Sequence, residues 1–461
     1  MLIYKDKSFV PTLVSLVIPV LLQNLLNASL NFVDVFMIGS LGETSIAAVG
    51  SANRFFFFYL MCMIGISSGA GIFAAQFWGK KDVRSIRSVM GTGIVLSTAI
   101  SLLFTSAIVL FPRSVIALFS KDPAVIGIGA EYILYISACY LIIPVAMSYA
   151  TILRSTGEVK LPMYASFVGV GLNTFGNYCL IFGSFGFPQM GVKGAAIATV
   201  VSRAIETSII VGYAYLKNTP AAVRFKDLVS IDRELLVKYV KCSVPIILQG
   251  AGWSFGYMMY SVIYGRVSTE SLAAYNLAGS IEQICLILFV GLGAASSIMI
   301  GNRIGAGEED KARGYAANFL QLALTGAVII GLALFFARDH LVSLYKLTNL
   351  GQEYLSGILI VTAVVLFAKA FNIVFHMGIF KGGGDTLFSM IVDVGGVWIV
   401  GVPLAALGAF VLHWPVHYIV ALAAAEEITK ATVAFVRLMS RKWIHNFAQK
   451  PAQVTEDTVP A

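Results

Sequence analysis

Four polar residues recur at helical spacing inside a long apolar segment near the N-terminus. They lie at i, i+4, i+8 and i+11, and they are Gln23, Asn27, Asn31 and Asp34. On a helix they fall within an arc of about 80°, and such a face must contact protein or water because lipid cannot satisfy its hydrogen bonds. The amides alone would suit a hydrogen-bonded seam between helices. The ionised form of Asp34 is costly there, and a carboxylate so placed is typical of a proton or sodium carrier.

Two later apolar segments contain further polar side chains. Asn173 and Asn177 repeat the i, i+4 spacing, and Thr199 follows in the small-residue run GAAIAT. Small residues let helices approach closely, so we expect the glycine and alanines of that run to serve packing. We interpret the two asparagines as candidate functional residues, with a structural role as the alternative.

Charged residues also occur inside the apolar segments of the second half. Lys369, Asn372 and His376 share one helical face, Asp393 lies in the next segment and Glu282 in an earlier one. A buried lysine needs a partner, which Asp393 or Glu282 could supply. These residues form either a coupling site or a structural ion pair.

Other charged and aromatic residues have simpler explanations. Two sets are spaced about one helical turn apart and are expected to neutralise themselves: Arg203 with Glu206, and Lys430 with Glu426 or Glu427. Trp253 and Tyr257 could form an aromatic wall for a substrate, although aromatic residues at helical spacing more often serve packing.

The composition explains why these polar residues matter. Of the 461 residues, 58% are hydrophobic and 12% are charged, whereas soluble proteins have about 45–50% and about 25%. The apolar residues form about a dozen runs, each long enough to cross ~30 Å of hydrocarbon as a helix. This pattern excludes a disordered chain, a secreted disulfide scaffold and an ordinary cytosolic enzyme.

Several classes of site are not indicated by the sequence. The formal charge is +8, but the basic residues flank apolar segments, where they set topology rather than bind nucleic acid. The five cysteines lack the spacing of a zinc site. No phosphate-binding loop and no HExxH or GxSxG signature occurs. We therefore predict no enzyme, no cofactor beyond a coupling H⁺ or Na⁺, and no metal site other than sodium at Asp34.

The apolar runs predict twelve membrane-spanning helices. The spans are 10–38, 47–77, 86–110, 127–152, 161–183, 192–216, 236–265, 276–303, 314–337, 353–380, 388–412 and 415–438. With the N-terminus inside, the inner segments hold 22 Lys and Arg residues and the outer loops six, which places both termini in the cytoplasm by the positive-inside rule. The N-terminus has no cleavage site, so the first helix is expected to be retained.

The chain repeats itself at an offset of 226 residues. The matched pairs include Pro19 with Pro245, Gln23 with Gln249, Gly65 with Gly291 and Gly79 with Gly305. One offset spans six helices, an even number, so we expect an all-α membrane protein of two six-helix lobes related by a pseudo-twofold along the membrane normal. The predicted parts are an N-terminal lobe (1–216), a cytoplasmic linker (217–235), a C-terminal lobe (236–439) and a disordered cytoplasmic tail (440–461).

Several segments resemble one transporter family. IPVLLQNLLNASLNFVDVFMIGSLGETSIAAVG is similar to the opening helix and loop of the multidrug and toxic compound extrusion (MATE) family. ILRSTGEVKLP, LNTFGNYCLIFGSFGFPQMGVKGAAIAT and IFKGGGDTLFSMIVDVGGVWIVGVPLA resemble that family's loops and helices at matching places. The resemblance covers residues 10–445. It implies two six-helix lobes around a central cavity, and a cation-coupled exporter that alternates between outward- and inward-facing states.

The resemblance also assigns roles to residues. It places the coupling proton or sodium ion at Asp34, with Asn173, Asn177 and Thr199 at matching positions of the first-lobe site. Many members of the family have a carboxylate at the position of Asn177. Two acidic positions in the second lobe of one branch are Trp253 and Ala370 here, so coupling through that lobe as in that branch is not expected. The positive charge of Lys369 near the cavity favours anionic or neutral amphiphiles over cationic drugs.

We therefore predict a multi-pass plasma (inner) membrane antiporter that exports amphipathic drugs or metabolites, contacts membrane lipid but no nucleic acid, and acts as a monomer. Candidates for the cavity or for coupling are Gln23, Asn27, Asn31, Trp253, Tyr257, Glu282, Lys369, Asn372, His376 and Asp393. The nearest alternative is a flippase for lipid-linked oligosaccharides on the same plan, whose cavity would need several basic residues where this chain has Lys369 nearly alone. An intramembrane enzyme or a channel is the remaining alternative.

Overall fold

A computed structural model describes residues 6–224, 227 and 232–449, and every regular element among them is helical. In the first half these are α1 (Phe9–Gly39), α2 (Glu43–Gly79), α3 (Val83–Leu110), α4 (Pro112–Ala117), α5 (Pro123–Ser155), α6 (Lys160–Phe182), the short helix η1 (Ser184–Gly186) and α7 (Val192–Leu216). In the second half they are α9 (Arg233–Val267), α10 (Thr269–Gly305), α11 (Glu309–Ser343), α12 (Asn349–Ile373), α13 (Phe380–Gly383), α14 (Thr386–Gly395), α15 (Val402–Ala406), α16 (Val416–Ala423) and α17 (Ala425–Met439).

The helices agree with the predicted spans. Ten helical segments of the described chain are long and apolar enough to cross a membrane. The α9 helix and the broken α16–α17 segment make up the other two of the twelve. Three π-helical turns interrupt the second half, η2 (Val374–Ile379), η3 (Gly396–Gly401) and η4 (Leu407–Val411), so that two of the expected single spans are composite. Turns of this kind widen a helix locally and are frequent at functional sites.

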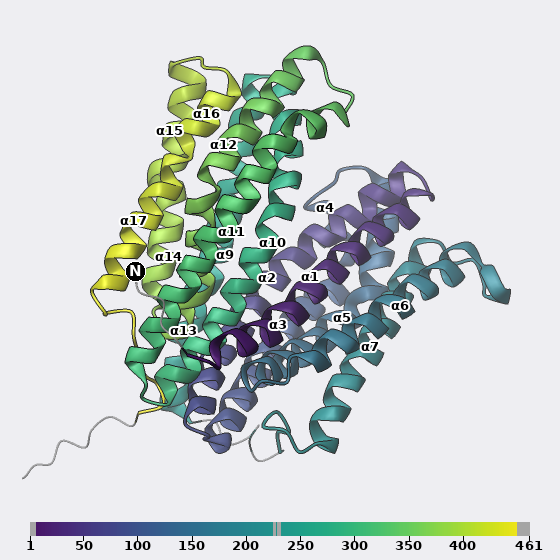
Figure 1. Ribbon diagram of the computed structural model, residues 1–461. Coiled ribbons are helices and arrows are strands. Elements are labelled where there is room, and N and C mark those ends of the chain that lie inside the picture. The colour runs from purple at the N-terminus through teal and green to yellow at the C-terminus, as the bar shows by residue number, and fades with distance from the viewer. Residues whose placement is uncertain (1–5, 225–226, 228–231, 450–461) are drawn as a thin grey trace, which may run out of the picture.

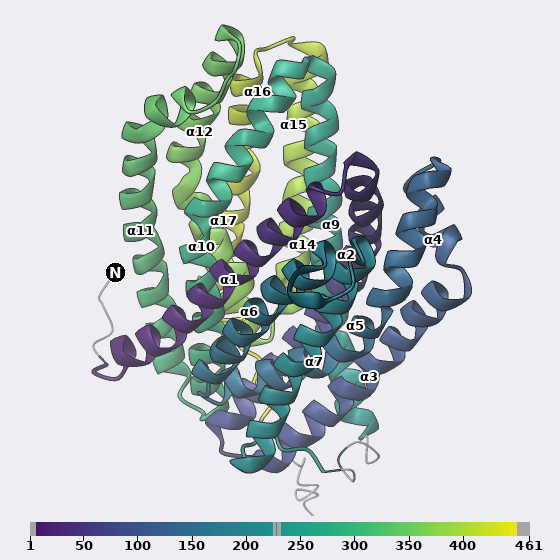
Figure 2. The same ribbon diagram turned by 90° about the vertical axis from the view of Figure 1, so that its right-hand side faces the viewer.

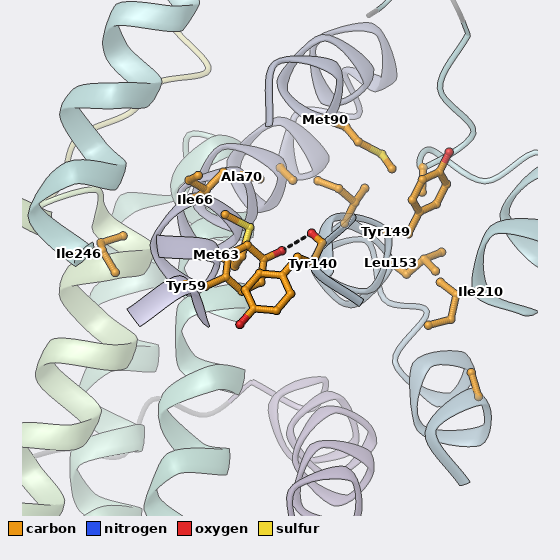
Figure 3. Close-up of a cluster of buried hydrophobic side chains, with 14 of the residues drawn as sticks. Tyr59, Met63, Ile66, Ala70, Met90, Tyr140, Tyr149, Leu153, Ile210 and Ile246 are labelled. Carbon is orange, nitrogen blue, oxygen red and sulfur yellow. Dashed lines mark hydrogen bonds between the residues drawn. The ribbon is translucent and has the colours of Figure 1, made fainter. Parts of the chain in front are cut away.

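Two bundles are visible in Figure 1 and Figure 2, one formed by α2 to α7 and the other by α9 to α17. They diverge toward the end that carries α4 and α16, and they meet at the end that carries α13 (Figure 1). The α1 helix packs on α6 of the first bundle and on α10 of the second. Apolar side chains fill each bundle; Figure 3 shows part of the first, where the Tyr59 hydroxyl donates to the Tyr140 carbonyl oxygen at 2.6 Å.

Close contacts between the halves repeat at the offset found in the sequence. A Cβ added to Gly79 would collide with the carbonyl oxygen of Asn302, and one added to Gly305 with that of Gln76. Residues 76 and 302 are related by the same 226 positions as residues 79 and 305. Exchange of partners in this way is the mark of a twofold axis, here between α2 and α10.

A second pair of contacts follows the same rule farther along these helices. Gly65 of α2 abuts the Ile247 side chain of α9, and Gly291 of α10 abuts Leu21 of α1, 2.8 Å from where its Cβ would lie. The pseudo-twofold relation predicted from the repeat therefore holds in the packing. The extent of each lobe stays a prediction, because residues 225–226 and 228–231 of the expected linker lie outside the described residues.

The end at which residues 76–82, 302–308 and 382–385 meet is named the closed end here. Gln76 donates to the carbonyl oxygens of Gly382 at 3.2 Å and His445 at 3.0 Å, and its own oxygen accepts from the Phe447 amide at 2.7 Å. Asn446 donates to the carbonyl oxygen of Ile304 at 2.7 Å. The C-terminal segment thus joins both halves at this end.

These contacts correct one expectation. We expected disorder from residue 440 onward because that stretch is polar, but residues 440–449 pack against the closed end. Trp443 is fully buried, and the Phe447 ring stacks on Phe73 with centroids 4.6 Å apart. These two aromatic side chains bury enough apolar area to order the segment, although its overall composition is polar. The remainder of the predicted tail, 450–461, lies outside the described residues.

Candidate functional site

The first-lobe candidates come together between three helices. Asp34 lies near the end of α1, Asn173 and Asn177 one turn apart on α6, and Thr199 on α7. The Asn177 amide donates to Asp34 Oδ1 at 2.5 Å and to Asn173 Oδ1 at 3.1 Å. The Asn173 amide donates to Thr199 Oγ1 at 3.0 Å. The four side chains therefore form one continuous hydrogen-bonded chain.

The hydrogen bonding of these four side chains is incomplete, and the unsatisfied acceptors suit a cation. Asn173 and Asn177 are buried, and the side-chain oxygen of Asn177 accepts no hydrogen bond among the described residues. Asp34 is half-buried and has no ion-pair partner in the described part of the chain. A carboxylate and an unsatisfied amide oxygen are hard oxygen ligands, which can accept a proton or bind Na⁺. No group of three or more His, Cys, Asp or Glu side chains in the described residues could hold a metal ion.

The rest of the polar face on α1 has a different role. The Gln23 amide donates to Ser166 Oγ at 2.9 Å, and Gln23 Oε1 accepts from Arg154 at 3.2 Å. Ser166 in turn donates to Glu206 at 2.7 Å, and Glu206 pairs with Arg203 at 2.7 Å. This part is the hydrogen-bonded seam that the amides suggested, and it holds α1 against α6 and α7.

Two further α1 candidates add little to this picture. Asn27 is half-buried between Gln23 and Asp34 along the helix. The Asn31 side chain lies outside the described residues, so its place in the predicted stripe is not described.

The second-lobe candidates also cluster. Lys369 on α12 pairs with Glu282 on α10 at 2.6 Å, one of the two partners considered from the sequence. Asp393 on α14 pairs instead with Lys430 on α17 at 3.2 Å, and it accepts from Gln249 at 2.9 Å.

The remaining members of this cluster lie close by. The Asn372 amide donates to Glu427 Oε2 at 2.6 Å, and His376 Nδ1 lies 2.9 Å from Ser389 Oγ. Sequence reasoning treated Lys430 and its neighbouring glutamates as a self-neutralising helix pair and so missed their contact with α14. Lys430 is 2% exposed. The sequence did contain a signal for this contact. The last apolar segments hold more ionisable residues than one ion pair within a single helix requires.

The two aromatic candidates occupy an accessible surface. The Trp253 and Tyr257 rings on α9 stack with centroids 5.3 Å apart, and the side chains are 48% and 40% exposed. Ala370, the other position compared with the acidic branch of the family, is fully buried. Position 253 and position 370 therefore carry no carboxylate that could bind a cation.

Comparison with known proteins agrees with this architecture. The sequence profile of the MatE family matches residues 19–179 and again 245–407. The chain is 28% identical over 397 residues to the probable multidrug resistance protein YoeA of Bacillus subtilis, covering 84% of each protein. It is 24% identical to the probable multidrug resistance protein NorM of Thermotoga maritima, over 99% of this chain and 97% of that protein.

A solved structure supports the fold. The Vibrio cholerae MATE transporter VcmN in its bent form superposes with a TM-score of 0.86 at 19% identity, over 94% of this chain and 97% of that one. The double profile match covers both halves at the offset of the repeat, and the helices follow the fold of this transporter throughout. The chain therefore belongs to the MatE family of multidrug and toxic compound extrusion transporters, which are ion-coupled membrane carriers rather than enzymes.

Proposed function

We propose that the protein exports amphipathic drug-like molecules in exchange for protons or sodium ions, with Asp34 as the residue that carries the ion in the first lobe. The observation that supports this most directly is the contact between Asp34 and Asn177, together with the free acceptor at Asn177 Oδ1. Asp34 forms no ion pair among the described residues, and Arg203, the basic residue in electrostatic range of it, is paired with Glu206, so the charge of Asp34 is open to neutralisation by a mobile ion.

In the proposed mechanism, ion binding changes the energy of α1. An ionised Asp34 keeps water or polar groups around it, because moving an uncompensated carboxylate into an apolar contact is costly. A bound ion removes that cost and lets α1 repack, with Pro19 inside the helix as the expected hinge. Since α1 contacts both bundles, its movement would alter their contact and release substrate. The coupling is limited by the difference in ion affinity between the two states.

We infer that the closed end faces the cytoplasm and that the structure corresponds to the outward-facing state. The loops and helix ends there carry Lys80, Lys81, Arg303 and Arg437, as the positive-inside rule requires of a cytoplasmic surface. The two bundles diverge at the opposite end (Figure 1). In this orientation both termini of the membrane protein would lie in the cytoplasm.

The second-lobe geometry revises the expected substrate. The argument for anionic substrates rested on an uncompensated Lys369, and the contact with Glu282 compensates that charge. We therefore propose cationic or neutral amphiphiles. The stacked and partly exposed Trp253 and Tyr257 offer them an aromatic surface, and the multidrug resistance names of YoeA and NorM agree with this class.

An export assay would test the proposal and identify the ion. Purified protein in proteoliposomes would be loaded with a fluorescent cationic dye, and a proton or a sodium gradient would be imposed separately. We expect one of the two gradients to drive dye movement against its concentration. If neither gradient drives dye movement, the proposal is contradicted. Transfer of a lipid-linked oligosaccharide instead would favour the flippase alternative.

A further inference from the structure

We propose that the second lobe contains its own proton-binding site, built around Lys430 from Asp393, Glu426 and Glu427. This inference deepens the proposed antiport, and its meaning for transport rests on that proposal. The proton itself can be detected without transport. The site lies where α17 packs against both α12 and α14 (Figure 1 and Figure 2).

Three carboxylates surround one ammonium group. Lys430 Nζ lies 3.2 Å from Asp393, 3.6 Å from Glu426 and 3.9 Å from Glu427. Glu426 also accepts from the Tyr260 hydroxyl at 2.7 Å. Since lysine provides a single positive charge, it cannot balance all three carboxylates.

Charges on the neighbouring helices do not restore the balance. Lys369 on α12 faces the cluster but is paired with Glu282 of α10. Lys381 on α13 lies within electrostatic range of Asp393, as does His376 of the η2 turn. With His376 neutral, the facing groups in the described part of the chain comprise four carboxylates and three ammonium groups, which leaves one negative charge in excess. Within a membrane protein an excess charge of this kind calls for one bound cation.

The protein backbone is shaped to hold these buried charges. A Cβ on Gly396 would lie 2.5 Å from Cε of Lys430, and one on Gly401 would collide with Glu426 and with the Tyr260 hydroxyl. The two glycines begin and end the η3 turn, so the widened helix lets the charged side chains pass close to its backbone. The cluster is thus a built site and not a chance gathering of side chains.

An unsatisfied acceptor points to the ligand. Asn372 is 6% exposed, and its amide nitrogen donates to Glu427 Oε2 at 2.6 Å and to the Glu427 carbonyl oxygen at 2.9 Å. The Asn372 Oδ1 atom belongs to the same carboxamide and hence lies inside the cluster, but it accepts no hydrogen bond among the described residues. The Nε2 atom of buried His376 also has no hydrogen-bond partner among them. A half turn of the carboxamide would place Oδ1 against Glu427, giving up the backbone bond. One asparagine could therefore donate to an ionised Glu427 and accept from a protonated one.

The geometry favours a proton over a sodium ion. A metal ion bound by these carboxylates would need the central position, which the Lys430 ammonium group already occupies at 3.2–3.9 Å from all three. A proton needs no such space, because it resides on a carboxyl oxygen. We therefore assign it to Glu427, whose neighbour Asn372 can serve both charge states.

Infrared difference spectroscopy would test the site directly. The full-length protein, reconstituted in lipid, would be stepped between about pH 8 and about pH 6, above the ordinary carboxyl pKa of about 4 so that exposed Asp and Glu stay ionised, while the C=O stretch of protonated carboxyl groups is recorded. We expect Asp34→Asn to retain a titrating carboxyl band and Asp34→Asn/Glu427→Gln to have none. Asp393→Asn in the Asp34→Asn background should also lose the band, because three carboxylates then balance three ammonium groups. This second variant keeps the test valid if Glu427→Gln does not fold.

A matched control separates charge excess from general disturbance. Glu282→Gln/Lys369→Gln, in the Asp34→Asn background, removes one charge of each sign and should keep the band. The inference is overturned if the band is missing in Asp34→Asn, if it survives both Glu427→Gln and Asp393→Asn, or if Na⁺ added at constant pH displaces it. Normal dye export by Asp34→Asn would instead contradict the proposed first-lobe function and leave this result unaffected.

Discussion

The side chain of Asp34 is the residue on which ion coupling depends. Asp34→Asn keeps the contact with Asn177 but removes the ionisable group, so we expect gradient-driven dye export to be lost while the thermal stability stays the same or rises slightly. Glu131→Gln is a suitable control, because Glu131 forms an exposed ion pair with Lys193 and such pairs contribute little. Dye accumulation assays on both variants, at equal membrane levels, check the prediction. Undiminished export by Asp34→Asn would refute it.

Asn177 sets the number of charges at the same site. Asn177→Asp would place a second carboxylate beside Asp34 and thus attract a cation more strongly. We expect half-maximal transport at a lower concentration of the coupling ion, measured by varying pH and Na⁺ separately. Asn173→Asp, one helical turn away and without direct contact with Asp34, should have the smaller effect. An unchanged ion dependence in Asn177→Asp would argue against its role as a ligand.

At the scale of helices, α2 and α10 cross with almost no space between their backbones. Gly305→Ala would force its Cβ against the Gln76 carbonyl oxygen. Overpacking of this kind costs about 1–3 kcal/mol, so we expect a lower melting temperature and a closed end more accessible to thiol reagents at introduced cysteines. Gly50→Ala serves as the control, since nothing lies within 4 Å of the added atom and alanine is favoured over glycine in a helix by roughly 0.5–1 kcal/mol. Equal behaviour of the two variants would contradict this.

Asp385 links α14 to the C-terminal segment outside the membrane-spanning helices. Burial alone would raise the pKa of this carboxyl, but the Arg437 side chain, which donates to Asp385 Oδ2 at 2.8 Å, and the nearby His445 ring outweigh burial and hold the pKa below its usual value. Because its folded-state pKa is lowered, the carboxyl stabilises the protein at any pH above the unfolded-state pKa of about 4. This stabilisation is lost as the pH falls through the lower, folded-state pKa. Asp385→Asn should therefore lower the melting temperature at neutral pH, with a difference that shrinks below pH of about 4. A difference that does not change with pH would exclude the ionic contribution.

For the whole molecule, alternating access requires the two halves to separate at the closed end. Gly69 lies about two helical turns before Gln76 of the closed end on α2. Its added Cβ would lie 3.3 Å from Cβ of Ser243 on α9, close to the spacing of about 3.5–4.5 Å in disulfides. We expect Gly69→Cys/Ser243→Cys to lose transport on oxidation and to regain it with a reducing agent. The single variants, treated alike, should be unaffected by oxidant. Full transport by the oxidised double variant would show that this contact need not open.

Much of the fold could be predicted because a membrane imposes simple rules. Spans must be apolar, long and helical, and an even number of helices per repeat fixes the relative orientation of the halves. The glycine pairs at the 226-residue offset, such as Gly79 with Gly305, proved to be symmetric contacts. The first-lobe polar residues could be named for the same reason, since lipid cannot accommodate Asp34.

The sequence by itself determined which residues must avoid lipid, and only the tertiary structure decided with whom each of them pairs. Helical spacing paired Lys430 with its own glutamates, yet the crossing of α17 over α14 brings Asp393 nearest. Lys369 had two candidate partners, and the packing of α12 on α10 selected Glu282. Phe447 likewise stacks on Phe73 of the other half, a contact that local spacing does not predict. Periodicity acts along one helix, whereas charge compensation depends on distances between helices, which local spacing does not encode.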